Sequence, residues 1–174
     1  MSKTLSDFRN FLKPSTKKVL FSISKALNEI NEIIGKQVFY SNINMNFNYK
    51  NKNEELLIYG YENEFKQVLL NIINNAKNKI VEKNLPLNKK GEININIQRC
   101  ENCNMIEIID DAGAIDEKII NSIFEPYFTT KENGMGLGLY MAKIIIEDKM
   151  KGTISVRNDK NCVIFTIKLP FKKA

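Results

Sequence analysis

The stretch ENEFKQVLLNIINNAKNKIVEK, residues 62–83, decides how this sequence folds. Apolar residues recur in it at spacings of three and four, which is the period of an α-helix with one buried face. These apolar residues are Phe65, Val68, Leu69, Ile72, Ile73, Ala76 and Ile80. The spacing predicts a helix over 62–83 that packs one side against a core.

Three asparagines of this helix, Asn71, Asn75 and Asn78, share one stripe at the margin of the apolar face. Asn is a mediocre helix former, so three at the border of a core need an explanation. A functional one is Mg²⁺ binding, because an amide oxygen is a hard ligand and Mg²⁺ takes one or two protein oxygens besides phosphates and waters. A compositional one is that the chain is rich in asparagine and places Asn74 on another face of the same helix.

Shorter segments surround this helix and alternate between strand and helix patterns. Before it we expect a strand at 21–23, a helix over 25–34, a strand over 43–49 and its hairpin partner at 56–59. After it we expect strands at 92–99 and 105–110, a short helix at 116–122, a loop over 124–138, a helix to about 149, and strands at 152–157 and 162–169. The interleaving predicts an α/β fold, in which helices cover a sheet in one layer pair.

A carboxylate ends one of these strands. Asp110 shares parity with Ile106 and Ile108, so its side chain should face the apolar side of the sheet. A carboxylate there is costly unless it meets a donor, and the exocyclic amine of a purine is such a donor. A solvated strand end is the equally simple alternative.

A glycine-rich loop, Gly134-Met-Gly-Leu-Gly-Leu139, opens the last predicted helix. Glycines let the backbone approach an anion, and the start of a helix favours phosphate. The loop is neither a Rossmann nor a Walker motif, because no strand directly precedes it and no Lys-Ser or Lys-Thr pair ends it.

Composition excludes several kinds of chemistry. The 174 residues contain no histidine, which removes imidazole bases, Ser-His-Asp nucleophiles and His metal sites. The net charge is +6, but residues 1–18 carry +4 and residues 168–174 carry +3, which leaves −1 for the rest. A nucleic-acid-binding domain shows its basic stripe on the folded body, so we expect no nucleic-acid partner. No apolar run approaches the ~20 residues of a membrane span and the start does not read as a signal peptide, so we expect a soluble, cytosolic chain.

The cysteines do not complete a metal site. Cys100 and Cys103 are spaced like half of a zinc site or a redox pair, but only Cys162 remains to join them. We expect a turn between two strands that carries two thiols.

Together, the three motifs resemble those of the ATP-binding domain of bacterial sensor histidine kinases, in the superfamily shared with gyrase and the large ATP-dependent chaperones. Residues 65–76 resemble the N box, 110–115 the G1 box, 124–131 the F box and 134–139 the G2 box, and the resemblance covers roughly 20–170. It implies an α+β sandwich: a mixed, mostly antiparallel five-stranded sheet with about three helices on one face and a mobile ATP lid.

The resemblance also implies roles for single residues. Asn75 would be the main Mg²⁺ ligand, with Asn71 beside it and Asn78 near the phosphates. Asp110 would accept from the adenine amino group and Ile115 would line the base pocket. The lid and the phosphate-facing loop would be formed by Phe124, Phe128, Thr130, Lys131, Gly134, Gly136, Leu137, Gly138 and Leu139, and Gly113 is the glycine that the G1 turn retains. Asn71 stands where the hydrolysing relatives carry a glutamate, and an amide cannot take a proton from water.

Departures from the family pattern occur at Ala112 and Ala114, where glycine is common, and at Cys162, where a glycine usually precedes the last strand. If position 114 needs a positive φ, alanine there costs about 1 kcal/mol or more and weakens nucleotide binding.

Residues 1–14 resemble the end of the second dimerisation helix of these kinases, which leaves 15–174 as the catalytic domain. We therefore expect a piece of a protein-histidine kinase that binds ATP and Mg²⁺ but does not autophosphorylate alone, because its phosphoacceptor histidine lies upstream. Its expected partners are the dimerisation domain of the same protein and a cognate response regulator. The intact protein would be a homodimer and this piece a monomer. A hydrolytic ATPase relative and a degenerate nucleotide-binding or interaction module without kinase activity remain the alternatives.

Overall fold

The computed structural model describes residues 13–86 and 88–171. The elements are, in order, β1 (Val19–Ser22), α2 (Ile23–Tyr40), β2 (Ile43–Tyr49), β3 (Leu57–Gly60), α3 (Glu62–Glu82), β4 (Gly91–Arg99), β5 (Cys103–Asp110), η1 (Ile120–Ser122), α4 (Gly138–Lys143), η2 (Ile144–Lys149), β6 (Thr153–Asp159) and β7 (Cys162–Pro170). Here η1 is a 3₁₀ turn and η2 a π-helical continuation of α4. The predicted end of a dimerisation helix lies, except for Lys13 and Pro14, outside the described residues.

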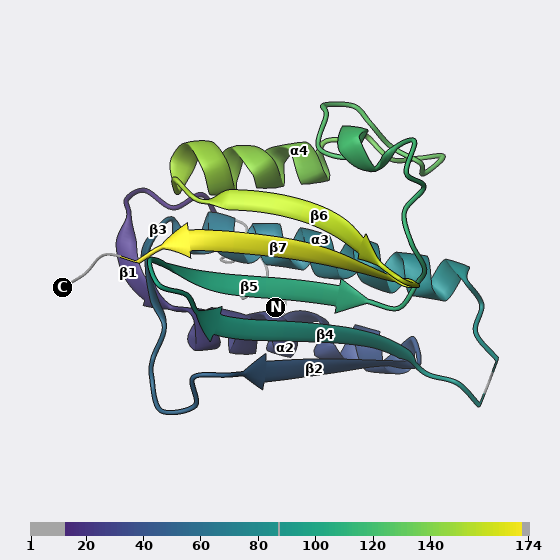
Figure 1. Cartoon of the computed structure of the whole chain (residues 1–174), viewed down its shortest axis with the longest axis horizontal. Helices are drawn as coiled ribbons and strands as arrows, with labels where there is room; N and C mark the ends of the chain where they lie inside the picture. The colour runs from purple at the N-terminus through teal and green to yellow at the C-terminus, as the bar shows by residue number, and fades with distance from the viewer. Residues whose placement is uncertain (1–12, 87, 172–174) are drawn as a thin grey trace, which may run out of the picture.

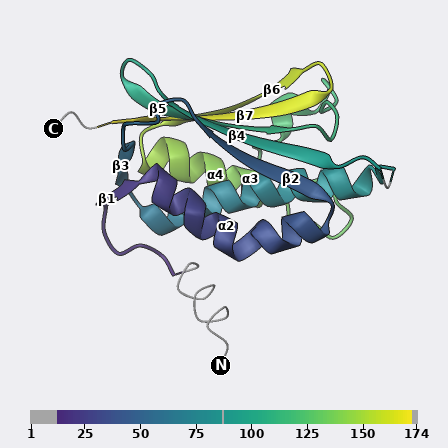
Figure 2. The same ribbon diagram turned by 90° about the horizontal axis from the view of Figure 1, so that it is seen from below.

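Five strands form one mixed sheet in the order β2-β4-β5-β7-β6. Only β2 and β4 run parallel, and the other three neighbouring pairs are antiparallel. Helices α2, α3 and α4 cover one face of this sheet, as the two perpendicular views show (Figures 1 and 2). The predicted α+β sandwich is confirmed.

Alternation in the strands explains which face carries the helices. In β4, Ile93, Ile95 and Ile97 are fully buried, whereas Asn94 and Asn96 between them are partly exposed. The buried isoleucines belong to the same core as the apolar face of α3, which confirms the helix predicted over 62–83. The apolar residues that recur every second position in the sheet and every 3.6 positions in α3 thus pack together in one interface.

The predicted hairpin of residues 43–49 with 56–59 is wrong. β3 pairs antiparallel with β1 in a separate two-stranded sheet, and β2 pairs in parallel with β4. Side-chain amides stabilise this parallel register, because Asn46 donates to Asn94 at 3.1 Å and Asn48 donates to Asn96 at 2.9 Å. Closeness in sequence favours a hairpin, but β2 and β4 both alternate asparagines with apolar residues, and in the parallel register these asparagines lie side by side.

Two helices differ in length from the prediction. α2 extends past residue 34 to Tyr40, although its last residues, Phe39 and Tyr40, are exposed. The helix expected at 116–122 shrinks to a single 3₁₀ turn. The Asp116 carboxylate accepts the backbone N–H of Lys118 at 2.9 Å, and such local bonds compete with helix formation.

The Cys-Glu-Asn-Cys segment is the tight connection between β4 and β5, where the Cys100 N–H donates to the Cys103 carbonyl at 2.7 Å. Both thiols and that of Cys162 are free. Across residues 13–86 and 88–171, no helix combines the length and the apolar character that crossing a membrane requires.

Candidate functional site

The predicted motifs meet along one stripe of α3, formed by Asn71, Asn75, Lys79 and the C-cap residue Lys83. These residues are four apart, so they follow one another on the same side of the helix. In order, they lie against the glycine-rich loop, the F-box segment, and two carbonyls of the turn that follows β5. A single helix therefore positions the segments that sequence analysis singled out.

Asn71 lies directly against the first residue of α4. A Cβ added at Gly138 would stand 2.6 Å from Asn71 Oδ1 and 2.8 Å from its Nδ2, so a side chain there would displace the Asn71 amide. Asn71 Nδ2 is buried and has no hydrogen-bond partner among the described residues. A buried amide without a partner is costly, and a bound phosphate or metal-bound water would satisfy it.

Asn75 meets the F-box segment, because Lys131 Nζ donates to Asn75 Oδ1 at 3.0 Å across 56 positions of sequence. The lone pair that this amide oxygen offers to the Lys131 ammonium is the kind of lone pair that an oxygen ligand offers to Mg²⁺. Asn78 lies half-buried almost one turn further along α3.

Asp110 ends β5 and is 3% exposed, so the prediction that it faces the apolar side is confirmed. Its Oδ1 accepts the backbone N–H of Ala112 at 3.1 Å. Burial raises the pKa of this carboxyl, while the Ala112 hydrogen bond and the nearby Lys79 oppose that rise. An acceptor placed in an apolar setting discriminates strongly in favour of a ligand that brings a donor.

The turn after Asp110 takes its left-handed residue at Gly113, whose φ is +104°. Ala112 and Ala114 have no positive φ, so the cost expected for alanine at position 114 does not arise from the backbone. Lys79 of α3 and Lys83, the C-cap residue of that helix, hold this turn. Lys79 Nζ donates to the Gly113 carbonyl at 3.3 Å and Lys83 Nζ donates to the Asp111 carbonyl at 3.2 Å.

Asn158 of β6 holds the end of the same turn, and the sequence analysis did not single it out. Its Oδ1 accepts the N–H of Ile115 at 2.9 Å and its Nδ2 donates to the Ile115 carbonyl at 2.8 Å. Ile115 is half-buried and packs against the core. No pattern in the sequence marks Asn158, because it is one asparagine among many at the end of an edge strand.

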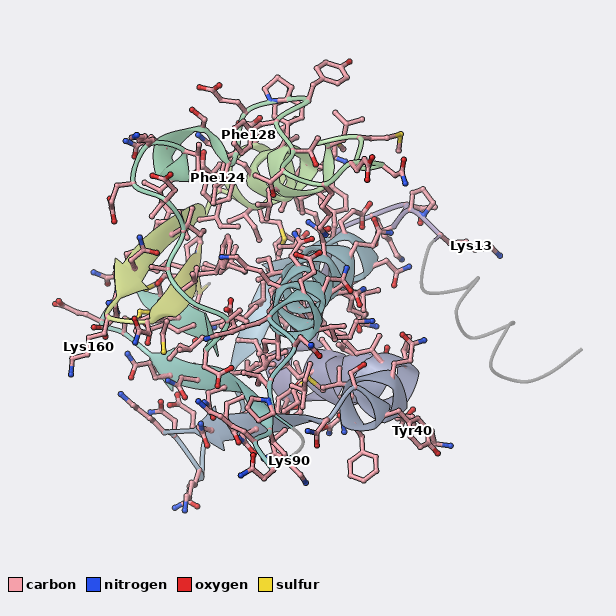
Figure 3. The ribbon with its side chains drawn as sticks, turned by 90° about the vertical axis from the view of Figure 1, so that its right-hand side faces the viewer. Lys13, Tyr40, Lys90, Phe124, Phe128 and Lys160 are labelled. Atoms are coloured by element: carbon pink, nitrogen blue, oxygen red, sulfur yellow. The ribbon has the colours of Figure 1, made fainter. Side chains whose placement is uncertain are left out.

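The F-box segment follows η1, and Figure 3 shows its Phe124 and Phe128 at the far end of the molecule from Tyr40 and Lys90. Phe124 packs edge-on against Phe165 of β7, with ring centroids 6.2 Å apart, and Phe128 is partly buried against the core. Both phenylalanines therefore anchor this segment. Thr130, next to the Lys131 that reaches Asn75, is exposed.

The glycine-rich loop folds back over the F-box segment. Gly136 has a φ of +67°, and a Cβ there would lie 2.4 Å from the backbone carbon of Tyr127. A Cβ at Gly134 would lie 2.4 Å from Thr129 Oγ1. Leu137 immediately precedes α4, and Leu139 is partly buried against the core. The two predicted motifs are thus one continuous packed segment.

These residues fit a magnesium nucleotide. They comprise amide oxygens suited to Mg²⁺, a buried amide nitrogen without a hydrogen-bond partner in the described part of the chain, and ammonium groups suited to phosphates. They also include the buried carboxylate of Asp110. A separate cavity of about 480 Å³ lies between the end of α2 and β2, and none of the predicted site residues lines it.

Residues 60–173 match the sequence profile of the family described as histidine kinase-, DNA gyrase B-, and HSP90-like ATPase. The chain is 30% identical over 171 residues to sporulation kinase A of Bacillus subtilis, covering 97% of this chain and 27% of that kinase. It is 29% identical over 154 residues to sporulation kinase B of the same organism, covering 88% and 34%. The chain thus spans about a third or less of the length of these two relatives.

Solved structures show the same architecture. The catalytic domain of histidine kinase ThkA superposes with a TM-score of 0.78 at 28% identity, covering 89% of this chain and 96% of that one. The residues that the family profile matches, 60–173, include the four predicted motifs of this chain. The chain belongs to the histidine kinase-, DNA gyrase B- and HSP90-like ATPase family and is a catalytic ATP-binding domain of the sensor histidine kinase type.

Proposed function

We propose that this domain holds Mg-ATP along the α3 stripe and presents the γ-phosphate to a histidine of a separate dimerisation domain. The observation that supports this most is the series of contacts from Asn71, Asn75, Lys79 and Lys83 to the three other motifs. Residues 15–174 would form this domain, and residues 1–14 would belong to the second dimerisation helix.

Asn75 is the main Mg²⁺ ligand in this proposal, with Asn71 beside it and Asn78 near the phosphates. Mg²⁺ neutralises charge on the transferring phosphoryl group and helps to align it. The contact of Asn75 Oδ1 with the Lys131 ammonium supports a cation-accepting role for this oxygen. Lys131 and the neighbouring Thr130 then lie at the root of the lid, within reach of the phosphates.

The adenine ring would lie between Asp110 and Ile115, beside Gly113. The buried Asp110 carboxylate accepts from the exocyclic amine, and Ile115 contributes an apolar wall. In the lid, Phe124 and Phe128 provide anchors, while Gly134, Gly136, Leu137, Gly138 and Leu139 form the end that faces the phosphates.

The reaction would be phosphoryl transfer rather than hydrolysis. Asn71 has no carboxylate to accept a proton from an attacking water, so water is not activated there. The chain contains no histidine, so the acceptor imidazole comes from another domain. Catalysis by this domain then consists of positioning and charge stabilisation.

The partners follow from this reaction. They are the phosphoacceptor and dimerisation domain of the same protein, which makes the intact kinase a homodimer, and a response regulator that receives the phosphate. ThkA, a histidine kinase of the same fold, has been solved in complex with the response regulator TrrA. We place the domain in the cytoplasm, where ATP is available, and expect this chain alone to be a monomer.

Calorimetry and a transfer assay test the proposal together. The purified chain should bind Mg-ADP and should label a separately prepared dimerisation domain with phosphate from ATP, while releasing little free phosphate alone. Absence of heat at millimolar Mg-ADP would favour a degenerate interaction module. Rapid phosphate release without an acceptor would favour the hydrolytic relatives.

A further inference from the structure

The turn formed by residues 111–115 is held by side chains that come from two different elements. Lys79 of α3 and Lys83, the C-cap residue of that helix, donate to the carbonyls of Gly113 and Asp111. From β6, Asn158 bonds both backbone groups of Ile115, at 2.9 and 2.8 Å. The turn thus lies between the nucleotide-binding helix and the edge strand of the sheet.

The Asn158 amide matches the backbone of Ile115 group for group. Its Oδ1 accepts where a neighbouring strand would offer a carbonyl, and its Nδ2 donates where that strand would offer an N–H. Nδ2 also donates to Glu117 Oε1 at 2.7 Å. One side chain therefore holds residues 115 and 117 of the loop that leaves the base pocket.

We propose that Asn158 is a positioning residue of the base pocket, which sets the place of Ile115 relative to Asp110. This inference rests on the proposed function, in which adenine lies between these two residues. Asp110 is anchored by β5, whose ladder to β7 extends to the pair Asp110–Val163. Ile115 lies five residues beyond that anchor, and β6 supplies its backbone partners through Asn158.

The contacts of Asn158 allow its effect on the base pocket to be separated from its effect on global stability. The side-chain bonds of Asn158 go to residues 115 and 117, which follow the end of β5, and among the described residues none of them goes to an α-helix. Removing them frees the wall of the pocket while the helices and the five-stranded sheet keep their contacts. Nucleotide affinity should therefore change more than global stability.

Asn158→Ala is the direct test, with Asn48→Ala as the matched control. Asn48 also makes a side-chain amide bond, to Asn96 at 2.9 Å on an exposed position of β2. Because two hydrogen bonds to the pocket wall are lost, we expect Asn158→Ala to weaken Mg-ADP binding about tenfold. Hydrogen exchange at residues 112–117 should accelerate at the same time. Asn48→Ala should leave both quantities unchanged.

Asn158→Asp separates the acceptor from the donor. It retains an oxygen for the Ile115 N–H but loses the donor to the Ile115 carbonyl and brings a second carboxylate near Glu117. Its Mg-ADP affinity should also fall, with a thermal midpoint close to that of the unchanged chain.

The outcomes distinguish this inference from the proposed function. If the unchanged chain binds Mg-ADP and both Asn158 variants bind it equally well, Asn158 is not a positioning residue and the proposed function stands. If the variants lose affinity only in proportion to their thermal stability, the role is structural and the inference is wrong. If the unchanged chain binds no Mg-ADP, the proposed function fails and the inference fails with it.

Discussion

Asp110 combines a stability cost with the binding role that we propose for it. Burial raises its pKa above the ordinary 3.8, so the folded protein holds a proton more readily than the unfolded chain does. The free energy of unfolding therefore falls as pH rises from about 3.8 through the raised value. In the proposed function the ionised form accepts from the adenine amine, so nucleotide binding would offset this cost.

We expect Asp110→Asn to abolish measurable Mg-ADP binding while leaving the fold as stable or more stable near neutral pH. The stability difference should vanish as pH falls below 4, because both side chains are then uncharged. Calorimetry and urea unfolding at several pH values measure the two effects. Asp159→Asn, at an exposed carboxylate on the same sheet, is the control and should retain binding.

Gly136 is the glycine whose replacement most directly tests the lid. Its φ of +67° and the 2.4 Å approach to the backbone of Tyr127 exclude a Cβ. Gly136→Ala should therefore loosen residues 127–138, speed their proteolysis and weaken nucleotide binding. Gly35→Ala in α2 is the control, since a Cβ there meets only the movable end of Asn31. Equal proteolysis of both variants would contradict a tightly packed lid segment.

At the scale of elements, α3 begins with a cap supplied from far away. Its own N-cap, Tyr61, makes no side-chain cap bond. Instead, Ser15 Oγ accepts the Asn63 N–H at 3.2 Å and the Glu64 carboxylate accepts the Ser15 N–H at 3.1 Å. This reciprocal pair is a capping box whose serine lies 48 positions before Asn63.

Ser15→Ala should lower the free energy of unfolding by about 1 kcal/mol, the usual value of a lost N-cap. Urea unfolding measures this change. Ser15→Thr retains the hydroxyl and should recover most of the loss. Ser155→Ala, at an exposed position of β6, should stay within about 0.5 kcal/mol of the unchanged chain. If Ser15→Ala behaves like Ser155→Ala, the contact does not cap the helix.

Local periodicity predicted the elements well and their pairing poorly. The bounds of β2 and α3 follow from alternation and from the 3.6-residue period, which reflect burial of one face. The partner of β3 does not follow from its own residues, because strand pairing depends on what the other strands offer. Whether β3 pairs with β1 or with β2 depends on the other strands, because β2 finds a better partner in β4.

At the scale of the whole molecule, Mg²⁺ should contribute to nucleotide binding through α3. Chelation of Mg²⁺ with EDTA should lower ADP affinity, because the amide oxygens of Asn71 and Asn75 interact with the phosphates chiefly through the metal. Asn75→Ala should bind ADP equally weakly with and without Mg²⁺. Thermal shift at several Mg²⁺ concentrations measures this, since ligand binding raises the unfolding midpoint. A strong Mg²⁺ effect in Asn75→Ala would assign the metal to other ligands.

The sequence predicted the motifs of the candidate site but not the side chains that join them. Asn75 and Asp110 were recognisable because an amide stripe and a core-facing carboxylate are unusual for their positions. Lys79 and Lys83 look like ordinary solvated lysines of a helix surface until the turn at 111–113 is placed beside them. Their roles depend on contacts over about 30 positions, which no local pattern contains.

The stripe of α3 also governs where this chain tolerates insertions. One extra residue between Asn71 and Asn75 would rotate every later position by about 100° relative to Asn71 and move the F-box and G1 contacts to another face of the helix. Extra residues between the motifs, such as in the connection from α3 to β4, would leave the stripe intact. The length of α3 is therefore constrained by its four contacts, whereas the loops between the motifs are free to vary.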